Sequence, residues 1–155
     1  MPELCPVIHS PRLDLVLMSP ALMRPDQAEH DPSATPWLPR VVLLRKDESA
    51  RHKATVVGDA GFHGPPDADG RVEIGYQVVS ERRRNGYAEE AVRALMAWAA
   101  AEHGIAWFRA SISPHNTPSL NLIRKLGFVQ VGTQQHETHG EELIFHHDSE
   151  NVQDR

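Results

Sequence analysis

Arg83-Arg84-Asn85-Gly86-Tyr87-Ala88 is the most informative stretch of this sequence, because it lies between a predicted strand and a predicted helix. The residues before it, 72–79, are rich in β-branched and aromatic side chains and follow Asp69-Gly70, which predicts a strand. After it, small and apolar residues recur at helical spacing as far as Gly104, which predicts a helix with a glycine C-cap. A basic turn that contains a glycine therefore leads into a helix N-terminus. Unpaired backbone N–H groups and a partial positive charge at such a terminus favour phosphate binding.

A second strand and a second helix are predicted downstream. Residues 105–112 have the composition of a strand. In the helical pattern that follows, Thr117 fits the N-cap, Pro118 the first helical position and Gly127 the position just after the C-cap. Two strands joined by a helix form a β-α-β unit, whose strands run parallel through a right-handed crossover.

Three motifs stand in this region: Glu73-Ile74-Gly75-Tyr76, Arg83-x-x-Gly86-x-Ala88, and Asn116-x-x-Ser119 with Lys125-Leu126-Gly127-Phe128. Together they resemble the GNAT superfamily of acyl-CoA-dependent N-acyltransferases, in particular its ribosomal-protein N-terminal acetyltransferase-like branch. The resemblance implies an α/β fold with a mixed, mostly antiparallel sheet and a central β-α-β unit that binds acetyl-CoA. It also implies transfer of an acetyl group to a primary amine by direct attack in a ternary complex. The acceptor is expected to be a protein N-terminus, a peptide amine or a small-molecule amine.

The resemblance also assigns two catalytic residues. Glu73 occupies the place where many members carry a general base, and burial in a partly apolar cleft would raise its pKa and suit it to that role. The alternative is a structural carboxylate in a salt bridge. Ser119 is the candidate donor to the leaving thiolate, because Ile123 stands where many members have a tyrosine. First-turn helix capping by Ser119, or proton donation by water, are the alternatives.

The resemblance further implies how acetyl-CoA is held. The backbone of residues 83–88 is expected to cradle the pyrophosphate, and the pantetheine arm to pair with the preceding strand. Asn116 is expected to bond either the pantetheine or the region around Ser119. The acetyl-CoA-binding residues expected on this basis are Val78, Val79, Arg83, Arg84, Asn85, Gly86, Tyr87, Ala88 and Asn116. Glu89 and Glu90 would repel phosphate, so we expect them to point away from the ligand.

Composition excludes several classes of protein. The formal net charge of −5 disfavours a nucleic-acid partner, which would require a basic face. The single cysteine, Cys5, excludes an internal disulfide. No apolar run approaches the roughly 20 residues needed to cross a membrane, so we expect a cytoplasmic protein with no membrane partner. The ten histidines lack zinc-ligand spacing, and we expect no metal.

A single domain is expected over residues 1–147, followed by a frayed tail over 148–155. Further strands are predicted at 13–18, 41–44 and 54–62, with a closing antiparallel pair at 128–131 and 142–146. The interval between Ser19 and Arg40 contains five prolines, which disfavour the two helices that family members usually have there. The acceptor pocket is therefore either open or completed by a second subunit in a homodimer. Trp37, among these prolines, is expected on the acceptor side.

Two alternative functions compete with acetyl transfer, and the sequence favours the first of them over the second. A catalytically degenerate GNAT domain would bind acyl-CoA as a sensor or regulatory module, since Ile123 cannot donate a proton. A nucleotide-binding α/β protein is disfavoured, because the sequence has neither a Walker lysine nor a G-x-G-x-x-G motif.

Overall fold

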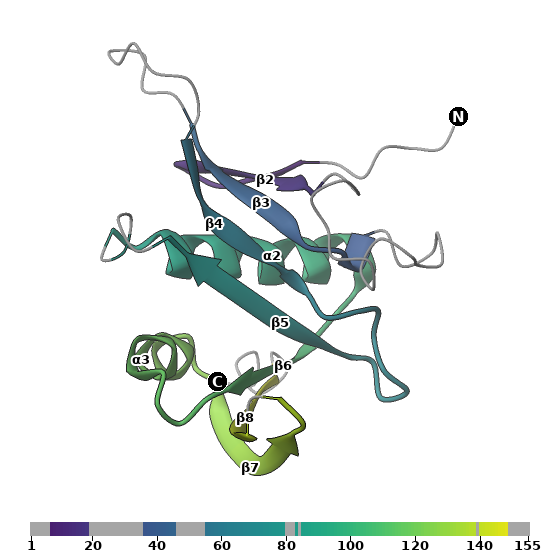
Figure 1. Ribbon diagram of the computed structural model, residues 1–155. Helices are drawn as coiled ribbons and strands as arrows, with labels where there is room; N and C mark the ends of the chain where they lie inside the picture. The colour runs from purple at the N-terminus through teal and green to yellow at the C-terminus, as the bar shows by residue number, and fades with distance from the viewer. Residues whose placement is uncertain are drawn as a thin grey trace.

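The protein forms one mixed sheet of eight strands, with helices packed against it (Figure 1). The computed structural model describes residues 7–18, 36–45, 55–79, 83, 85–138 and 140–148. Its elements are β1 (Ile8–His9), β2 (Leu13–Leu17), β3 (Arg40–Leu44), β4 (Thr55–Phe62), β5 (Arg71–Val78), α2 (Tyr87–His103), β6 (Trp107–Ile112), α3 (Thr117–Lys125), β7 (Val129–His136) and β8 (Gly140–Asp148). The strand order is β1-β2-β3-β4-β5-β6-β8-β7. Among the strands of the described ranges, only the pair β5 and β6 runs parallel, as the β-α-β prediction requires.

Helix α2 covers one face of this sheet and supplies much of the core. Its buried residues are Ala91, Val92, Leu95 and Ala99, which recur at helical spacing on one side. They belong to one core cluster with Val72, Ile74 and Phe108 of the sheet, which are at most 2% exposed. Full burial of such a side chain stabilises the fold by about 1.5–3 kcal/mol. The helix ends at Gly104, as predicted, where φ is +66°.

Three local predictions need correction. Asn116, not Thr117, is the N-cap of α3, and its Oδ1 accepts a hydrogen bond from the Ser119 N–H at 3.3 Å. An Asn side chain caps a helix at least as well as Thr, and this shifts the helix start by one residue. The closing strands β7 and β8 are longer than predicted, because their hairpin extends pairing to His136 and Gly140. The short strand β1 was not predicted, and two residues carry too little periodicity to reveal it.

The C-terminal strand also extends one residue beyond the expected domain end. Asp148 pairs with Trp107 in the sheet, and its carboxylate lies 2.8 Å from the Arg71 guanidinium. Arg71 also donates to the carbonyl of Phe108 at 3.1 Å. Asp148 is therefore part of β8, and the rest of the predicted tail, 149–155, lies outside the described residues.

Trp37 packs in the core, and its place on the acceptor side stays a prediction. It is 6% exposed, and its ring lies 5.2 Å from Phe62 and 6.0 Å from Trp98. The antiparallel register of β3 and β4, in which Arg40 lies opposite Ala60, brings the residues just before β3 beside the end of β4. Most of the proline-rich interval, residues 19–35, lies outside the described part of the chain. None of the helices in the described ranges is long and apolar enough to span a membrane.

His147 should make the stability of the fold depend on pH. Its ring packs 5.1 Å from Phe128 and 6.3 Å from Phe108, and burial lowers the pKa of His147 below the ordinary 6.5. The folded state therefore favours the neutral ring. This contribution to stability is fully present above pH 6.5 and is lost as the pH falls below that value. We expect His147→Phe to flatten the fall in unfolding free energy between about pH 6.5 and 5, measured by urea denaturation.

His115→Phe is the control, because His115 is exposed just before α3. A small slope should persist in His147→Phe, since burial and the charges of Arg71 and Arg109 also lower the pKa of His146. An unchanged slope in His147→Phe would show that this ring does not carry the acid sensitivity.

Candidate active site

The central feature of the site is the separation of β5 from β6. The two strands pair over Arg71 to Glu73 on β5, opposite Trp107 to Arg109 on β6. Within the described residues their pairing stops there, although β5 runs on to Val78 and β6 to Ile112. Figure 1 shows the two strands diverging toward α3. The opening exposes backbone groups in the middle of a sheet, where neighbouring strands would normally satisfy them.

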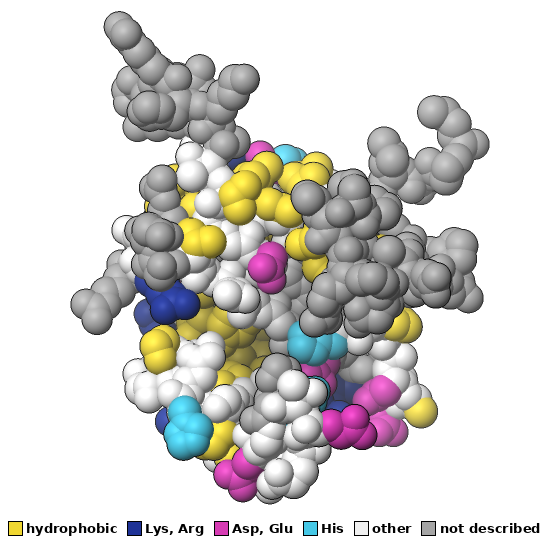
Figure 2. Space-filling view, viewed as in Figure 1, with side chains coloured by type: hydrophobic (Ala, Val, Ile, Leu, Met, Phe, Trp, Pro, Cys, Tyr) yellow, Lys and Arg dark blue, Asp and Glu magenta, His cyan; other side chains and the backbone are white. Residues whose placement is uncertain are grey.

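A cleft of about 560 Å³ lies in this opening, between β5, the start of α2 and α3. We refer to it as the β5–α3 cleft. Figure 2 shows a hollow there, lined by hydrophobic side chains, with Lys or Arg side chains at one edge. Of the predicted site residues, it brings together Val78, Arg83, Gly86, Tyr87, Ala88, Asn116 and Ser119.

The edge of β5 offers backbone groups to this cleft. The Val79 N–H donates to the Val57 carbonyl, and the His63 N–H donates to the Glu73 carbonyl, both at 2.9 Å. Residues of an antiparallel strand alternate in the side to which their peptide groups point, so those of Tyr76 and Val78 face the cleft. The Val78 carbonyl accepts a hydrogen bond from Arg83 Nε at 3.2 Å. Val79, by contrast, is bonded within the sheet and lies outside the cleft lining.

The N-terminus of α2 lies at one end of the cleft. Gly86 is its N-cap with φ of +78°, a conformation that L side chains rarely adopt, and no side chain among the described residues caps the helix. The uncapped N–H groups of the first turn suit an anionic ligand. Asn85 donates to the Arg83 carbonyl at 3.2 Å and does not line the cleft. Arg84 lies outside the described residues.

The two acidic residues of the first turn of α2 have different positions. Glu90 points away from the cleft, as expected, and bonds the backbone N–H of Arg12 at 2.8 Å and its Nε at 2.7 Å. Burial would raise the pKa of Glu90, but its hydrogen bonds with Ser10 and Arg12 outweigh burial and lower it.

Glu89 lines the cleft, contrary to expectation. Its carboxylate lies 2.8 Å from Lys125 Nζ and 3.1 Å from Arg93 Nε. Hydrogen bonds from Lys125 and Arg93 lower the pKa of Glu89. Two cations therefore offset this negative charge beside the helix terminus.

Ser119 lies in the cleft with its hydroxyl uncommitted to helix capping, since Asn116 performs that role. This capping bond also satisfies one of the two alternatives predicted for Asn116, a bond to the Ser119 region. The Tyr76 hydroxyl donates to the Ser119 carbonyl at 3.3 Å. Burial raises the pKa of Tyr76, so this phenol stays protonated at neutral pH. Tyr76 thus ties β5 to α3 across the cleft.

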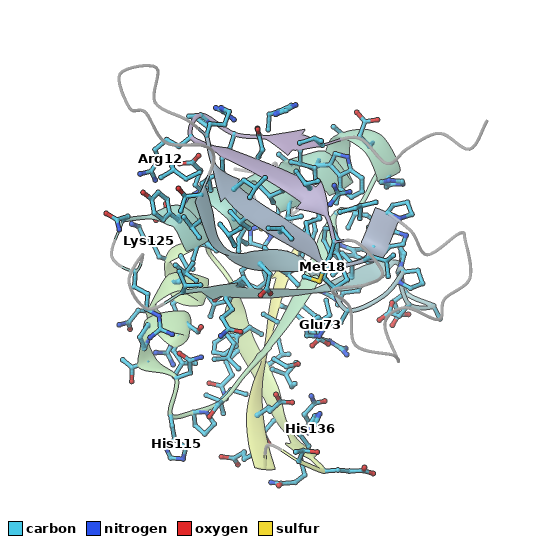
Figure 3. The ribbon with its side chains drawn as sticks, turned by 45° about the horizontal axis from the view of Figure 1, so that its top comes forward. Arg12, Met18, Glu73, His115, Lys125 and His136 are labelled. Carbon is cyan, nitrogen blue, oxygen red and sulfur yellow. The ribbon has the colours of Figure 1, made fainter. Side chains whose placement is uncertain are left out.

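Glu73 stands at the last paired position of β5, where the strands separate. It lines a smaller cavity of about 170 Å³ together with His63, Asp67 and Arg109. In Figure 3, Glu73 and Lys125 lie toward opposite ends of β5. The Glu73 carboxylate is 3.1 Å from His63 Nδ1.

The pKa of Glu73 is lowered, whereas the sequence analysis expected it to be raised. Burial alone would raise it. Hydrogen bonds from His63 and Ser111, together with the charges of His63 and Arg109, outweigh burial. Glu73 is therefore ionised at neutral pH.

Sequence reasoning missed two residues of this site, His63 and Tyr76. His63 became visible only through the β4–β5 register, which places it opposite Glu73. Tyr76 was part of a quoted motif, and its alternation with Val72 and Ile74 could have placed its side chain on the α2 face of β5. Among the residues that the structure describes, no group of three or more His, Cys, Asp or Glu side chains is positioned to hold a metal ion.

Comparison with known proteins agrees with this architecture. Residues 16–129 match the acetyltransferase (GNAT) domain. The uncharacterized N-acetyltransferase YjdG of Bacillus subtilis is 36% identical over 88 residues, which are 57% of this chain and 49% of that protein. A GNAT-family acetyltransferase from Bacillus anthracis has a TM-score of 0.68 at 19% identity, covering 93% of this chain and 99% of that chain. RimJ of Mycobacterium smegmatis, solved in complex with CoA-disulfide, has a TM-score of 0.63 at 21% identity, covering 74% of this chain and 54% of that chain.

The chain spans about half the length of the curated relatives that it matches. The domain match covers most of this chain, and it includes the β5–α2–β6 unit and α3, which together frame the cleft. This chain therefore belongs to the acetyltransferase (GNAT) domain family.

Proposed function

We propose that this protein transfers an acetyl group from acetyl-CoA to a primary amine. The observation that carries this proposal is the separation of β5 from β6 at Glu73. It opens a cleft with a helix N-terminus at one end, and the ionised Glu73 carboxylate lies in the smaller cavity beside the point of separation. An acyl-CoA is a long molecule with anionic phosphates toward one end and a thioester at the other. The helix N-terminus suits the phosphates, and the carboxylate suits an amine that attacks the thioester.

The cleft residues fit acetyl-CoA in a particular orientation. The first turn of α2 would receive the pyrophosphate, with Arg83 and Lys125 supplying positive charge at the rim. The backbone of Tyr76 and Val78 would pair with the amides of the pantetheine arm, as an added strand would. This orientation directs the thioester toward Ser119 and the point where the strands separate.

The reaction would proceed by direct attack. The nitrogen of a neutral amine attacks the thioester carbonyl, a C–N bond forms, and the C–S bond breaks with its electron pair going to sulfur. An amine with a pKa near 10 is mostly protonated at neutral pH, so a group near Glu73 must remove its proton. Ser119 would donate a proton to the departing thiolate, and Tyr76 would hold the Ser119 segment in place. We propose a peptide N-terminus or a small-molecule amine as the acceptor.

Ligand-dependent unfolding and thiol release test this function. Acetyl-CoA at about a hundredfold excess over its Kd should raise the unfolding free energy by about 2.7 kcal/mol, while ATP and NAD should not. Free thiol should be released from acetyl-CoA when the protein is incubated with acceptors from a panel of peptides, polyamines and amino acids. Binding of acetyl-CoA without release of its thiol in the presence of any amine would instead support a sensor or regulatory module.

Ser119→Ala should lower kcat by about 10- to 100-fold and leave acetyl-CoA affinity near the wild-type value. The expected loss is at the lower end of general-acid effects, because a thiolate with a pKa near 8.5 needs only modest help to leave. Turnover by thiol release and affinity by calorimetry separate the two quantities. Ser113→Ala is the control, since Ser113 accepts a backbone bond in the turn before α3 and does not line the cleft. Lost affinity with normal kcat would make Ser119 a ligand contact.

A further inference from the structure

We propose that Glu89 competes with the phosphates of CoA for Lys125, and that this competition weakens the binding of acetyl-CoA and speeds the release of CoA. The inference rests on the proposed function, because it concerns the same β5–α3 cleft and the same ligand. It follows from the position of one carboxylate, which lines the cleft beside the helix turn proposed to receive the pyrophosphate.

Glu89 places a negative charge at the phosphate end of the cleft. Among the described residues that line the cleft, Glu89 carries the negative charge, and Arg83 and Lys125 carry the positive charges. Glu89 belongs to the first turn of α2, three residues after Gly86. Hydrogen bonds from Lys125 and Arg93 lower the pKa of Glu89, so its carboxylate is ionised at neutral pH. A phosphate bound at the N–H groups of this turn would therefore meet a like charge.

This carboxylate holds Lys125, which comes from another helix. Lys125 is the last residue of α3, and its Nζ lies 2.8 Å from Glu89 Oε1. The pair joins the first turn of α2 to the last turn of α3. The side chain of Lys125 is 66% exposed and that of Glu89 26%, so the ammonium can turn toward a ligand with little loss of packing. Exposed ion pairs contribute little to stability, so a phosphate can displace the carboxylate from Lys125.

Arg93 keeps the carboxylate in place when Lys125 leaves it. Arg93 Nε lies 3.1 Å from Glu89 Oε2, one helical turn further along α2. Arg93 also lines a neighbouring cavity of about 560 Å³, which shares Glu89 with the β5–α3 cleft. The other acid of this turn, Glu90, is bonded to Arg12 and does not line the cleft. Glu89 therefore remains a negative charge beside the phosphates after the ligand has bound.

The other cation of the cleft must also exchange its partner. Arg83 Nε donates to the Val78 carbonyl at 3.2 Å, and that carbonyl is one of the groups proposed to pair with the pantetheine arm. Acetyl-CoA would thus replace a carbonyl at Arg83 and a carboxylate at Lys125. The exchange at Lys125 leaves a negative charge behind, whereas the exchange at Arg83 does not. Glu89 is therefore the residue whose neutralisation should tighten binding.

The competition affects product release. CoA carries the same phosphates as acetyl-CoA, so a carboxylate that repels them acts on substrate and product alike. Changes in affinity among variants of one site arise mostly in the dissociation rate. Product release limits turnover in many enzymes. Glu89 thus favours the departure of CoA after each transfer.

Neutralising the carboxylate tests the proposal. Glu89→Gln should tighten the binding of CoA and acetyl-CoA by about three- to tenfold, because one like charge is removed and Lys125 is released to the phosphates. Calorimetry gives the Kd, and in stopped-flow displacement CoA should leave more slowly by a similar factor. S-acetylpantetheine has the thioester arm but no phosphate, so its affinity, measured by displacement of CoA, should not change. Glu102→Gln, the same charge change at an exposed position of α2, is the control.

A double variant shows whether the effect passes through the ion pair. Lys125→Gln alone should weaken CoA binding by about tenfold, the low end for a hydrogen bond to a charged group. Glu89→Gln should then give a smaller gain in affinity in the Lys125→Gln background than in the wild type. An equal gain in both backgrounds would overturn the competition for Lys125.

The direction of the change separates competition from a structural role. A carboxylate that only held α2 against α3 would weaken CoA binding when it was neutralised. Unchanged or weaker CoA affinity in folded Glu89→Gln would therefore overturn the proposal, as would equal tightening of S-acetylpantetheine. Failure of the wild type to bind acetyl-CoA would instead refute the proposed function itself.

Discussion

Replacing Glu73 by glutamine is expected to lower kcat by about 10²- to 10⁴-fold, the range of general acid–base contributions. Glutamine keeps the shape of the side chain and removes its charge. The side chain could then no longer accept the proton of the amine, and its ion pair with His63, at 3.1 Å, would be lost. The effect should appear in kcat, measured by thiol release with the true acceptor, while the Kd of acetyl-CoA stays near wild type.

The pH profile identifies which group titrates. The pKa of Glu73 is lowered below its ordinary 4.5, so its carboxylate is ionised at neutral pH and loses its charge only in more acidic solution. A fall in wild-type kcat that begins above pH 4.5 would therefore report a group other than Glu73. Glu102→Gln, an equal charge change at an exposed position of α2, is the control. Near wild-type kcat in Glu73→Gln would leave Glu73 with only the structural salt bridge that the sequence also allowed.

The β-α-β unit could be predicted because its signals are local. Helix α2 begins after a glycine and ends at another, and its buried side recurs with helical spacing. Residues 72–78 carry the β-branched and aromatic side chains of a strand beside Asp69-Gly70. Such patterns depend on neighbours a few residues away, which the sequence displays directly.

The electrostatics of the site could not be predicted in the same way. The sign of the pKa shift at Glu73 depends on His63, just after β4, and on Arg109 and Ser111 of β6. Glu89 lines the cleft because Lys125, on another helix, reaches its carboxylate. These contacts depend on strand register and helix packing, and burial alone would have given Glu73 the opposite shift.

Gly86→Ala should weaken acetyl-CoA binding by about tenfold to a hundredfold, the loss of one or two charge-assisted hydrogen bonds. Gly86 is the N-cap of α2 with φ of +78°, and it lines the cleft. An alanine there must either accept the left-handed conformation, at about 1–2 kcal/mol, or move the first turn of the helix. A moved turn would no longer direct its N–H groups at the pyrophosphate.

Gly104→Ala separates the loss of binding from the loss of stability. Gly104 caps the other end of the same helix with φ of +66°, and an added Cβ there meets nothing within 4 Å. Both variants should therefore lose a similar unfolding free energy in urea, but only Gly86→Ala should lose calorimetric affinity for acetyl-CoA. Equal affinity in the two folded variants would remove the first turn of α2 from the acetyl-CoA site. The pyrophosphate would then have to bind elsewhere, such as at the Arg83 and Lys125 side chains, where charge and not backbone geometry sets the affinity.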